Sequence, residues 1–508
     1  MCSSRISAHG PKISFCVLPI SPAESPSDLI KDRIVNMHRH RWFLPVVMVC
    51  LTSCTGSTAT LPGEIEPRAE NVVSGNQRPD ILMVVVDDLG WADVGFSGGR
   101  SHLTPKIDAF ARDAVFFDNA YSDAPNCAPS RCSMITGLAT PRHGVLTVGS
   151  SRRGKAELRK IEPVPSVRFL SPDVLTLPDR LQDDGYRTVH IGKFHVGPDP
   201  LEYGFTDQIA GSGAGHPKSY SSPYRNPSLE DGMDGEYLTD RLADEAVHVI
   251  EGEDDRPLFM HLSFYSVHTP IQPRGDLLAE SRRRLPEARG IEQRYDAMVS
   301  AVDEAFGRVL EVFEARDRPK MVIFTSDHGG YGPLADNGPL RGSKGMLYEG
   351  GIRVPLLIRW PGERRAACVH APVLLRDLVP TILEASQTSH LEKDFDAVAI
   401  SSDENDVSGN DRSLHWHFPV YLERDSSVDG PWRTTPVAAV RKGRYKLIEF
   451  FEDGRLELYD LRDDPSESRN LAMMFPEVVS ALKAEMDGWR RHVGAELPSS
   501  FAGSNGGA

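Results

Sequence analysis

The 508-residue chain has few cysteines and no excess of basic residues, and its one marked apolar run is short. Seven cysteines cannot supply a dense disulfide framework for a chain of this length. A formal net charge of −15 argues against nucleic acid as the partner, because binding a phosphate backbone normally needs a basic surface. Hydrophobic residues at 40% and charged residues at 25% are ordinary for a folded protein. The length exceeds the usual size of one core, which predicts one large domain and one smaller domain.

The short apolar run, 42–51, belongs to a segment that predicts export. It follows Met37 and the basic stretch 38–41, and it is too short to span a bilayer but suits the core of a signal peptide. It ends in Leu-Thr-Ser-Cys, which resembles the lipobox of bacterial lipoproteins. We therefore predict a non-native leader over 1–36, a lipoprotein-type signal peptide over 37–54 and a tether over 55–79.

Lipidation of Cys54 would anchor the protein to a membrane, so the predicted location is the periplasm, the outer membrane or the cell surface. A short buried helix is the alternative interpretation of the same run, and Met1 and Met37 both stay open as the start. Processing would leave three cysteines, Cys127, Cys132 and Cys368. The last two could form a bridge, but we expect them to be buried as small hydrophobic side chains.

Several short apolar runs separated by helical patterns predict an α/β fold with a large, mainly parallel sheet flanked by helices. The runs are 81–86, 187–191, 258–264, 321–324 and 354–358. Amphipathic or apolar helices are predicted within 238–250, 295–313 and 374–383. We assign this pattern to a catalytic domain over 80–393.

From residue 394 onward the pattern changes to that of a smaller α+β domain, 394–508. Short strands separated by turns at Gly443 and Gly454 precede a helix over 476–493. The strands are predicted over 437–440, 445–450 and 457–461. Two loops rich in Gly, Ser, Pro and Asp, 211–231 and 401–432, are expected to shape the rim of the site.

Charged residues and histidines follow four of the predicted strands. They are Asp87 and Asp88, then Lys193 and His195, then His268, and finally Asp327 and His328. The carboxyl ends of the strands form the ligand crevice of an open α/β sheet, so these side chains are expected to converge. Each one alone could be a helix cap or a surface residue, but four such coincidences favour one site.

The strongest local pattern is Cys-Ala-Pro-Ser-Arg at 127–131, which continues to Thr136 and Gly137. It resembles the sulfatase signature C-x-P-S-R-x-x-x-x-T-G, in which a maturation enzyme oxidises the cysteine to formylglycine. Other segments resemble the same family in the same order: V-V-V-D-D-L-G-W, G-K-F-H-V-G, S-V-H-T-P, T-S-D-H-G and L-R-G-S-K-G, the last with Lys344. The chain is thereby identified as similar to formylglycine-dependent sulfatases of the alkaline phosphatase-like superfamily.

This resemblance implies a sulfuric ester hydrolase that uses formylglycine from Cys127 and one calcium ion. The implied metal ligands are Asp87, Asp88, Cys127, Asp327 and His328. Carboxylate oxygens suit calcium. Many sulfatases have Asn where His328 stands, so His328 would either bind the metal directly or orient a carboxylate.

The catalytic residues implied by the resemblance are Cys127, Arg131, Lys193, His195, His268 and Lys344. A hydroxyl of the hydrated aldehyde, made acidic by the metal with Arg131 and Lys193, would attack sulfur. His268, with Lys344 nearby, would protonate the leaving oxygen. His195 would then help to release sulfate. Arg131 could in addition cap its helix, and Lys344 could instead be a solvated loop charge.

Two other functions remain open at this point. One is hydrolysis of phosphonate or phosphate esters by the same superfamily, and the other is anion binding without catalysis by an unmodified cysteine. The predicted partners are a sulfated small molecule or glycan and a formylglycine-generating or sulfatase-maturing enzyme. Carbohydrate is the expected substrate class because sulfated polysaccharides meet an exported enzyme outside the cell.

Overall fold

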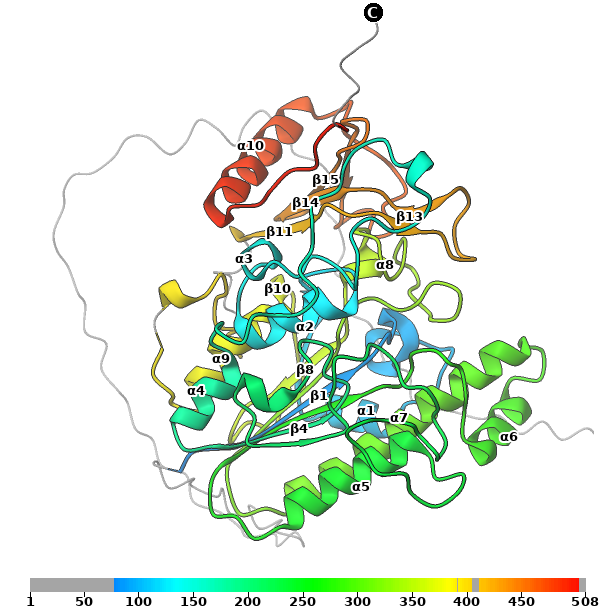
Figure 1. Ribbon diagram of the computed structural model, residues 1–508, viewed down its shortest axis with the longest axis vertical. Coiled ribbons are helices and arrows are strands. Elements are labelled where there is room, and N and C mark those ends of the chain that lie inside the picture. Colours follow the sequence, from blue (N-terminus) through cyan, green and yellow to red (C-terminus); the bar gives the residue numbers. More distant parts are fainter. Residues whose placement is uncertain (1–76, 391, 404–410, 502–508) are drawn as a thin grey trace, which may run out of the picture. The chain divides into compact units, whose positions relative to one another are not determined.

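Figure 1 shows the computed structural model, which describes residues 77–390, 392–403 and 411–501. An eight-stranded sheet runs through it in the order β5-β4-β6-β1-β7-β8-β2-β9. The strands are β1 (Asp80–Val86), β2 (Val115–Phe117), β4 (Arg187–Gly192), β5 (Asp207–Ile209), β6 (Leu258–Phe264), β7 (Lys320–Ser326), β8 (Leu356–Arg359) and β9 (Ala367–Val369). The predicted leader, signal peptide and nearly all of the tether lie outside the described residues.

Helices cover both faces of this sheet, because its central strands are apolar on both sides. On β1, Leu82, Val84 and Val86 join one hydrophobic cluster, and Ile81, Met83 and Val85 join another. The first cluster includes α5 (Leu238–Glu251) and α7 (Gly290–Glu314). The second includes α2 (Cys127–Thr136), α4 (Leu177–Asp183) and α9 (Leu378–Ala385), drawn on the opposite side of the sheet in Figure 1. The predicted fold class is confirmed.

One predicted strand runs in the direction opposite to its neighbour. The run 354–358 overlaps β8, which begins at Leu356 and pairs antiparallel with β7. β2 in turn pairs antiparallel with β8 and parallel with β9. β8 is buried along its length like the parallel strands, and hydrophobicity carries no information on strand direction. The sheet is therefore mainly, but not wholly, parallel.

The parallel strands end in register at one edge of the sheet. Val86 of β1 lies opposite Phe264 of β6 and Ser326 of β7. Gly192 of β4 lies opposite Ser263 of β6. The residues that follow β1, β4, β6 and β7 consequently leave the sheet side by side, which is the arrangement that a shared site requires.

A second, antiparallel sheet follows in the chain. It comprises β11 (Ser413–Phe418), β14 (Val437–Lys442), β15 (Tyr445–Phe450) and β16 (Leu456–Asp460). One face packs against α10 (Pro476–Val493), and the other packs against Tyr121, Ile352 and Leu374 of the preceding part. The sequence did not predict β11, whose aromatic and histidine side chains were assigned to a loop.

Short elements complete the described chain. They are β3 (Ala120–Tyr121), β10 (Val373–Leu374), β12 (Leu422–Glu423), β13 (Trp432–Thr434), α1 (Pro105–Ala111), α3 (Thr140–His143), α6 (Gly275–Arg284) and α8 (Glu349–Ile352). No helix within the described ranges is both long and apolar enough to cross a membrane.

The structure answers the prediction for the two remaining cysteines. Cys132 is a buried free thiol, as expected. Cys368 is also a free thiol, but its side chain on β9 is exposed, so its predicted burial is wrong.

A buried ionic cluster joins the second sheet to α8. Lys446 of β15 places its Nζ 2.9 Å from Glu349 Oε1 and 3.0 Å from Glu467 Oε1, and all three side chains are fully buried. The backbone N–H of Glu349 donates to Glu467 Oε2 at 2.7 Å. Burial raises the pKa of Glu467 to about 7, although Lys446 acts in the opposite direction. The lysine therefore compensates two carboxylates that water cannot reach.

Replacing this lysine is expected to destabilise the fold strongly. Lys446→Met would leave Glu349 and Glu467 buried without their cation, at a cost of about 3–5 kcal/mol. The matched control on the same sheet is Lys442→Met, which breaks the half-exposed pair with Glu485 and should cost less than about 1 kcal/mol. The midpoint of urea unfolding should fall markedly only in the first variant. Equal shifts in the two variants would show that the buried cluster is dispensable.

Candidate active site

The residues that follow the four strands do come together, as their positions in the sequence predicted. Asp87 and Asp88 follow β1, and Asp327 and His328 follow β7. The backbone N–H of Asp88 donates to Asp327 Oδ1 at 3.3 Å, which ties the two strand ends together. All four side chains are buried.

Cys127 enters the same site as the first residue of α2. All residues of this helix are buried, and Gly137, with φ of 72°, ends it by donating its N–H to the Ser133 carbonyl at 2.9 Å. The helix directs the partial positive charge of its N-terminus toward Cys127. Burial alone would raise the pKa of the Cys127 thiol, but Lys193 and Lys344 outweigh burial and hold this pKa well below its usual value.

Four groups in the site form a set of possible metal ligands. One atom from each of Asp87, Asp88, Cys127 and His328 lies within 4.8 Å of the others. Asp327 borders the set, with its Oδ1 3.5 Å from His328 Nε2. Asp87 Oδ1 is buried and has no hydrogen-bond partner within the described chain. A buried carboxylate oxygen in this condition is unfavourable unless a cation or donor satisfies it.

His328 points its Nε2 into the middle of this set. Nε2 lies 3.3 Å from Cys127 Sγ and 3.4 Å from Asp88 Oδ1. The other ring nitrogen, Nδ1, lies 2.9 Å from the Gly329 carbonyl. If Nδ1 donates to this carbonyl, Nε2 carries the free electron pair that a metal ligand needs.

Arg131 and Lys193 contact carboxylates of the site. Arg131 Nε lies 2.8 Å from Asp327 Oδ2, and Lys193 Nζ lies 2.5 Å from Asp87 Oδ2. Arg131 also donates to the Lys193 carbonyl at 2.9 Å and to Ser263 Oγ at 2.6 Å. Burial raises the pKa of Asp87 well above its usual value against the opposing effect of Lys193. These two cations keep the neighbouring carboxylates in place and partly neutralise them.

Three side chains surround Cys127 on its solvent-facing side, namely Lys344, His268 and His195. Lys344 Nζ lies 2.5 Å from Asp88 Oδ1 and 3.5 Å from Cys127 Sγ, so it is not a solvated loop charge. His268 Nε2 lies 3.6 Å from Asp88 Oδ2, and His195 lines the same cavity as Cys127. Burial lowers the pKa of His268 to about 4 and also lowers the pKa of His195.

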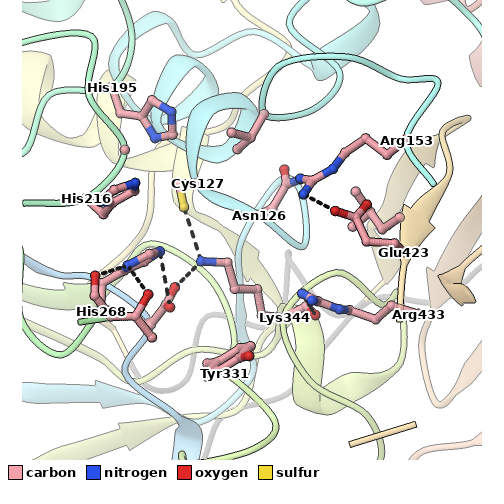
Figure 2. A pocket seen from close by; sticks show the side chains of 15 residues that line it. Asn126, Cys127, Arg153, His195, His216, His268, Tyr331, Lys344, Glu423 and Arg433 are labelled. Atoms are coloured by element: carbon pink, nitrogen blue, oxygen red, sulfur yellow. Dashed lines mark hydrogen bonds and ion pairs between the residues drawn. The ribbon is translucent and has the colours of Figure 1, made fainter. Parts of the chain in front are cut away.

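These side chains open into a cavity of about 340 Å³, whose surroundings Figure 2 shows. Cys127 lines it between Lys344 on one side and His195 and His268 on the other. Arg153 and Glu423 form an ion pair next to Arg433. Glu423 and Arg433 come from the β12–β13 hairpin, so the predicted rim loop 401–432 does contribute to the cavity.

Two contributors in the predicted rim loop 211–231 were not identified individually from the sequence. The His216 ring stacks on that of His268, with centroids 5.9 Å apart and ring planes at 9°. Gly215 lies so close to His195 that a Cβ there would come 2.6 Å from His195 Cε1. The sequence signal for these residues is a histidine directly after the glycine-rich stretch Gly-Ser-Gly-Ala-Gly. This local pattern does not indicate which distant residue the histidine contacts.

Two residues of the site have unusual backbone conformations. Asp88 has φ of 63° and His195 has φ of 58°, both in the left-handed region that non-glycine residues seldom adopt. Such conformations persist where the surroundings fix them, and they are concentrated at functional sites.

Comparison with known proteins decides the family. The model described as Sulfatase matches residues 79–388, which is more than half of the chain, and a second model, N-sulphoglucosamine sulphohydrolase, C-terminal, matches residues 342–492. The chain belongs to the sulfatase family. Its reaction class is therefore hydrolysis of sulfuric esters.

Curated sulfatases align over much of the chain. A protein named Sulfatase from Formosa agariphila is 30% identical over 478 residues, covering 78% of this chain and 85% of that protein. Human N-acetylgalactosamine-6-sulfatase is 30% identical over 342 residues, covering 60% of this chain and 62% of that protein. The match to the human enzyme thus spans less than two thirds of its length.

Solved structures resemble this sulfatase over most of the described fold. The structure of Ps i-CgsB in complex with k-i-k-neocarrahexaose has a TM-score of 0.67 and 25% identity, covering 81% of this chain and 93% of that chain. A protein in complex with its substrate D-glucosamine-2-N,6-O-disulfate has a TM-score of 0.62 and 19% identity, covering 84% of this chain and all of that chain. The second likeness is one of fold alone.

The contact between Gly215 and His195 yields a test of the site. Gly215→Ala would place a methyl group 2.6 Å from His195 Cε1, so the imidazole must move and kcat for 4-nitrophenyl sulfate should fall by about 10- to 100-fold. Gly275→Ala is the matched control, because a Cβ at Gly275 meets no atom within 4 Å. Both variants should keep the melting temperature of the parent sulfatase. Full activity in the Gly215 variant would mean that the position of His195 does not matter.

Proposed function

We propose that this sulfatase removes sulfate from a carbohydrate ester, using formylglycine made from Cys127 and one calcium ion. The observation that carries the proposal is the position of Cys127. Cys127 lines the cavity, and its Sγ lies 3.3 Å from His328 Nε2 and 3.5 Å from Lys344 Nζ. A nucleophile at this point would face both the possible metal ligands and the proton donors.

The residues that would hold calcium are Asp87, Asp88, Asp327, His328 and the oxygen of the modified residue 127. This set fits calcium because carboxylate oxygens dominate it and because Asp87 Oδ1 has no hydrogen-bond partner in the described chain, only Arg131 Nη2 at 4.0 Å. We include His328 as a direct ligand, since its Nε2 points to the other ligand atoms. Bound calcium would supply a fixed positive charge for the oxygens of the sulfate group.

Formylglycine in its hydrated form would supply two hydroxyls on one carbon, one to attack sulfur and one to allow release of sulfate. His195 lines the same cavity as residue 127 and would take up the proton during release. Lys193 and Arg131 would act through Asp87 and Asp327, which they hold by short ion pairs. Their charge would also favour an anion in the site.

His268 and Lys344 would assist departure of the alcohol. Both line the cavity beside Cys127, and Lys344 keeps a raised pKa because the nearby carboxylate of Asp88 outweighs the effect of burial. The low pKa of His268 would rise once a sulfate ester is bound, because a nearby negative charge favours the protonated imidazole. A higher pKa is what His268 needs in order to donate a proton to the leaving oxygen.

A carbohydrate substrate is supported by the names of relatives and by the cavity. The human relative is named N-acetylgalactosamine-6-sulfatase, and Ps i-CgsB was solved in complex with k-i-k-neocarrahexaose. The open cavity with Arg153, Glu423 and Arg433 offers charged hydrogen-bonding groups of the kind that bind sugar hydroxyls. Export through segment 37–54, with lipid on Cys54 and a location in the periplasm, the outer membrane or at the cell surface, remains part of this proposal.

Replacing Cys127 tests the proposed nucleophile. Cys127→Ala should abolish hydrolysis of 4-nitrophenyl sulfate by enzyme made together with a sulfatase-maturing enzyme, because no aldehyde can form. Cys132→Ala, in the same helix, is the matched control and should retain most activity. Mass spectrometry of the peptide that carries position 127 should show an aldehyde in the parent protein. An unmodified thiol in active enzyme, or faster turnover of an aryl phosphonate than of the aryl sulfate, would contradict the proposal.

Removing calcium tests the proposed metal. Treatment with EGTA should lower turnover of 4-nitrophenyl sulfate by about 100-fold or more, and added calcium should restore it, because the sulfate oxygens lose their fixed positive charge. Asp88→Asn should bind less calcium than the parent in equilibrium dialysis. The exposed Asp173→Asn variant is the control and should bind as much as the parent. Full activity after chelation would exclude calcium from the reaction.

A further inference from the structure

A second cavity of about 460 Å³ adjoins the one that contains Cys127. The two cavities share four lining residues, Val148, His195, Gly215 and His216. His195 is thus one of the residues that border both cavities. A ligand that reached from Cys127 into the second cavity would pass along these shared residues.

The second cavity is basic. Arg168, Lys218 and Arg225 line it, and its lining includes no aspartate or glutamate. The three side chains are exposed, and none forms an ion pair with any residue that the structure describes. Asp231 lies near in the chain, but its Oδ1 accepts the backbone N–H groups of Tyr224 at 2.6 Å and Arg225 at 3.3 Å, and it forms no ion pair with the Arg225 guanidinium.

In the first cavity, by contrast, the lysine and the arginines form ion pairs. Lys344 is paired with Asp88, Arg153 with Glu423, and Arg433 with Asp425 at 3.0 Å. Each of these cations already has a carboxylate partner within the protein. The chain as a whole carries a formal charge of −15, so three unpaired cations around one cavity form a local positive field against the overall charge.

The two loops that carry these cations, one with Arg168 and one with Lys218 and Arg225, are held in place by contacts within the protein. Asn226, next to Arg225, donates to the Ala210 carbonyl at 3.2 Å, and the Tyr265 hydroxyl donates to the same carbonyl at 2.9 Å. Gly213 lies against Phe169, where a Cβ would come 2.8 Å from the ring. The Arg168 guanidinium lies over the same ring, 4.8 Å from its centroid. The cations are thus attached to fixed walls, which lowers the entropic cost of binding an anion.

We propose that this second cavity binds another anionic group of the substrate, a sulfate or carboxylate on the sugar next to the one that carries the scissile ester. The inference rests on the proposed function, since it assumes that the sulfate to be removed lies at Cys127. It narrows the substrate class to oligosaccharides with at least two anionic groups. Arg168, Lys218 and Arg225 would then determine substrate specificity and take no part in the chemical step.

The test replaces the three cations with glutamine in the combined variant Arg168→Gln, Lys218→Gln and Arg225→Gln. The probe is a heparin-derived tetrasaccharide, which carries both sulfates and carboxylates, and its binding is measured by calorimetry on the mature protein. The dissociation constant should rise by about tenfold, because three exposed charge contacts are lost. kcat/KM for 4-nitrophenyl sulfate, which has no second anion, should stay within about twofold of the parent.

A control variant separates a local effect from the general loss of positive charge. Arg282→Gln, Arg283→Gln and Arg491→Gln together remove three exposed cations from α6 and α10, away from both cavities. The tetrasaccharide should bind to this control as it binds to the parent. The single variant Lys218→Gln provides a milder change, for which a rise of about twofold in the dissociation constant is expected.

Two modified probes identify the anion. A desulfated tetrasaccharide retains only carboxylates, and a carboxyl-reduced tetrasaccharide retains only sulfates. The probe whose binding still depends on the three cations carries the group that the cavity recognises.

The inference is overturned if the parent does not bind the tetrasaccharide, if the triple variant binds it as the parent does, or if the control loses as much affinity. A parent that binds the tetrasaccharide but cannot hydrolyse 4-nitrophenyl sulfate would refute the proposed function instead. The two failures are therefore distinguishable.

Discussion

Compensation of buried carboxylates at one edge of the sheet is the interaction on which the rest of this structure depends. Asp87 and Asp327 are fully buried, and each contacts a fully buried cation from another segment, Lys193 and Arg131 respectively. An isolated carboxylate at such a depth would be prohibitively unfavourable. The ion pairs therefore bind the ends of β1 and β7 to α2 and to the segment after β4. The ion pairs that stabilise Asp87 and Asp327 in the interior also position Cys127, because Arg131 lies on the same helix, α2.

Not all buried polar atoms of the site form hydrogen bonds within the described chain. Asp87 Oδ1 and one terminal nitrogen of Arg131 have no hydrogen-bond partner in the described chain, although both are buried. Asp88 and His195 adopt left-handed backbone conformations, and Gly215 provides room for the His195 ring. A folded protein keeps such unfavourable features where a bound group compensates them or where the reaction needs them. Their concentration around Cys127 agrees with its place in a sulfatase.

The cavities draw on segments far apart in the chain. The β12–β13 hairpin supplies Glu423 and Arg433, although it follows the main sheet by many residues, and the loop 211–231 supplies the wall beside His195. The buried contact of Lys446 with Glu349 and Glu467 holds the antiparallel sheet against the main part of the chain. The chemistry and the shape of the binding surface thus come from different parts of the protein, so specificity can vary while the centre is kept.

The sequence by itself determined five of the eight strands of the main sheet, β1, β4, β6, β7 and β8, and the polar residues at the ends of four of them, whereas the short strands β2, β5 and β9 were not predicted. Buried parallel strands are continuous apolar runs, a local signal that β1, β6 and β7 display clearly. The order of polar residues after those runs, together with the cysteine motif, was also readable, because each is a short pattern in the chain. β11 was missed because its histidines and tryptophan do not form such a run.

Only the tertiary structure decided the direction of β8, the exposure of Cys368 and the neighbours of His195. Strand direction depends on how the chain returns to the sheet, and hydrophobicity does not record it. The meeting of Arg168, Lys218 and Arg225 depends in the same way on loop paths. Loops lack the periodicity of helices and strands, so the side chains they bring together cannot be paired before the chain has folded.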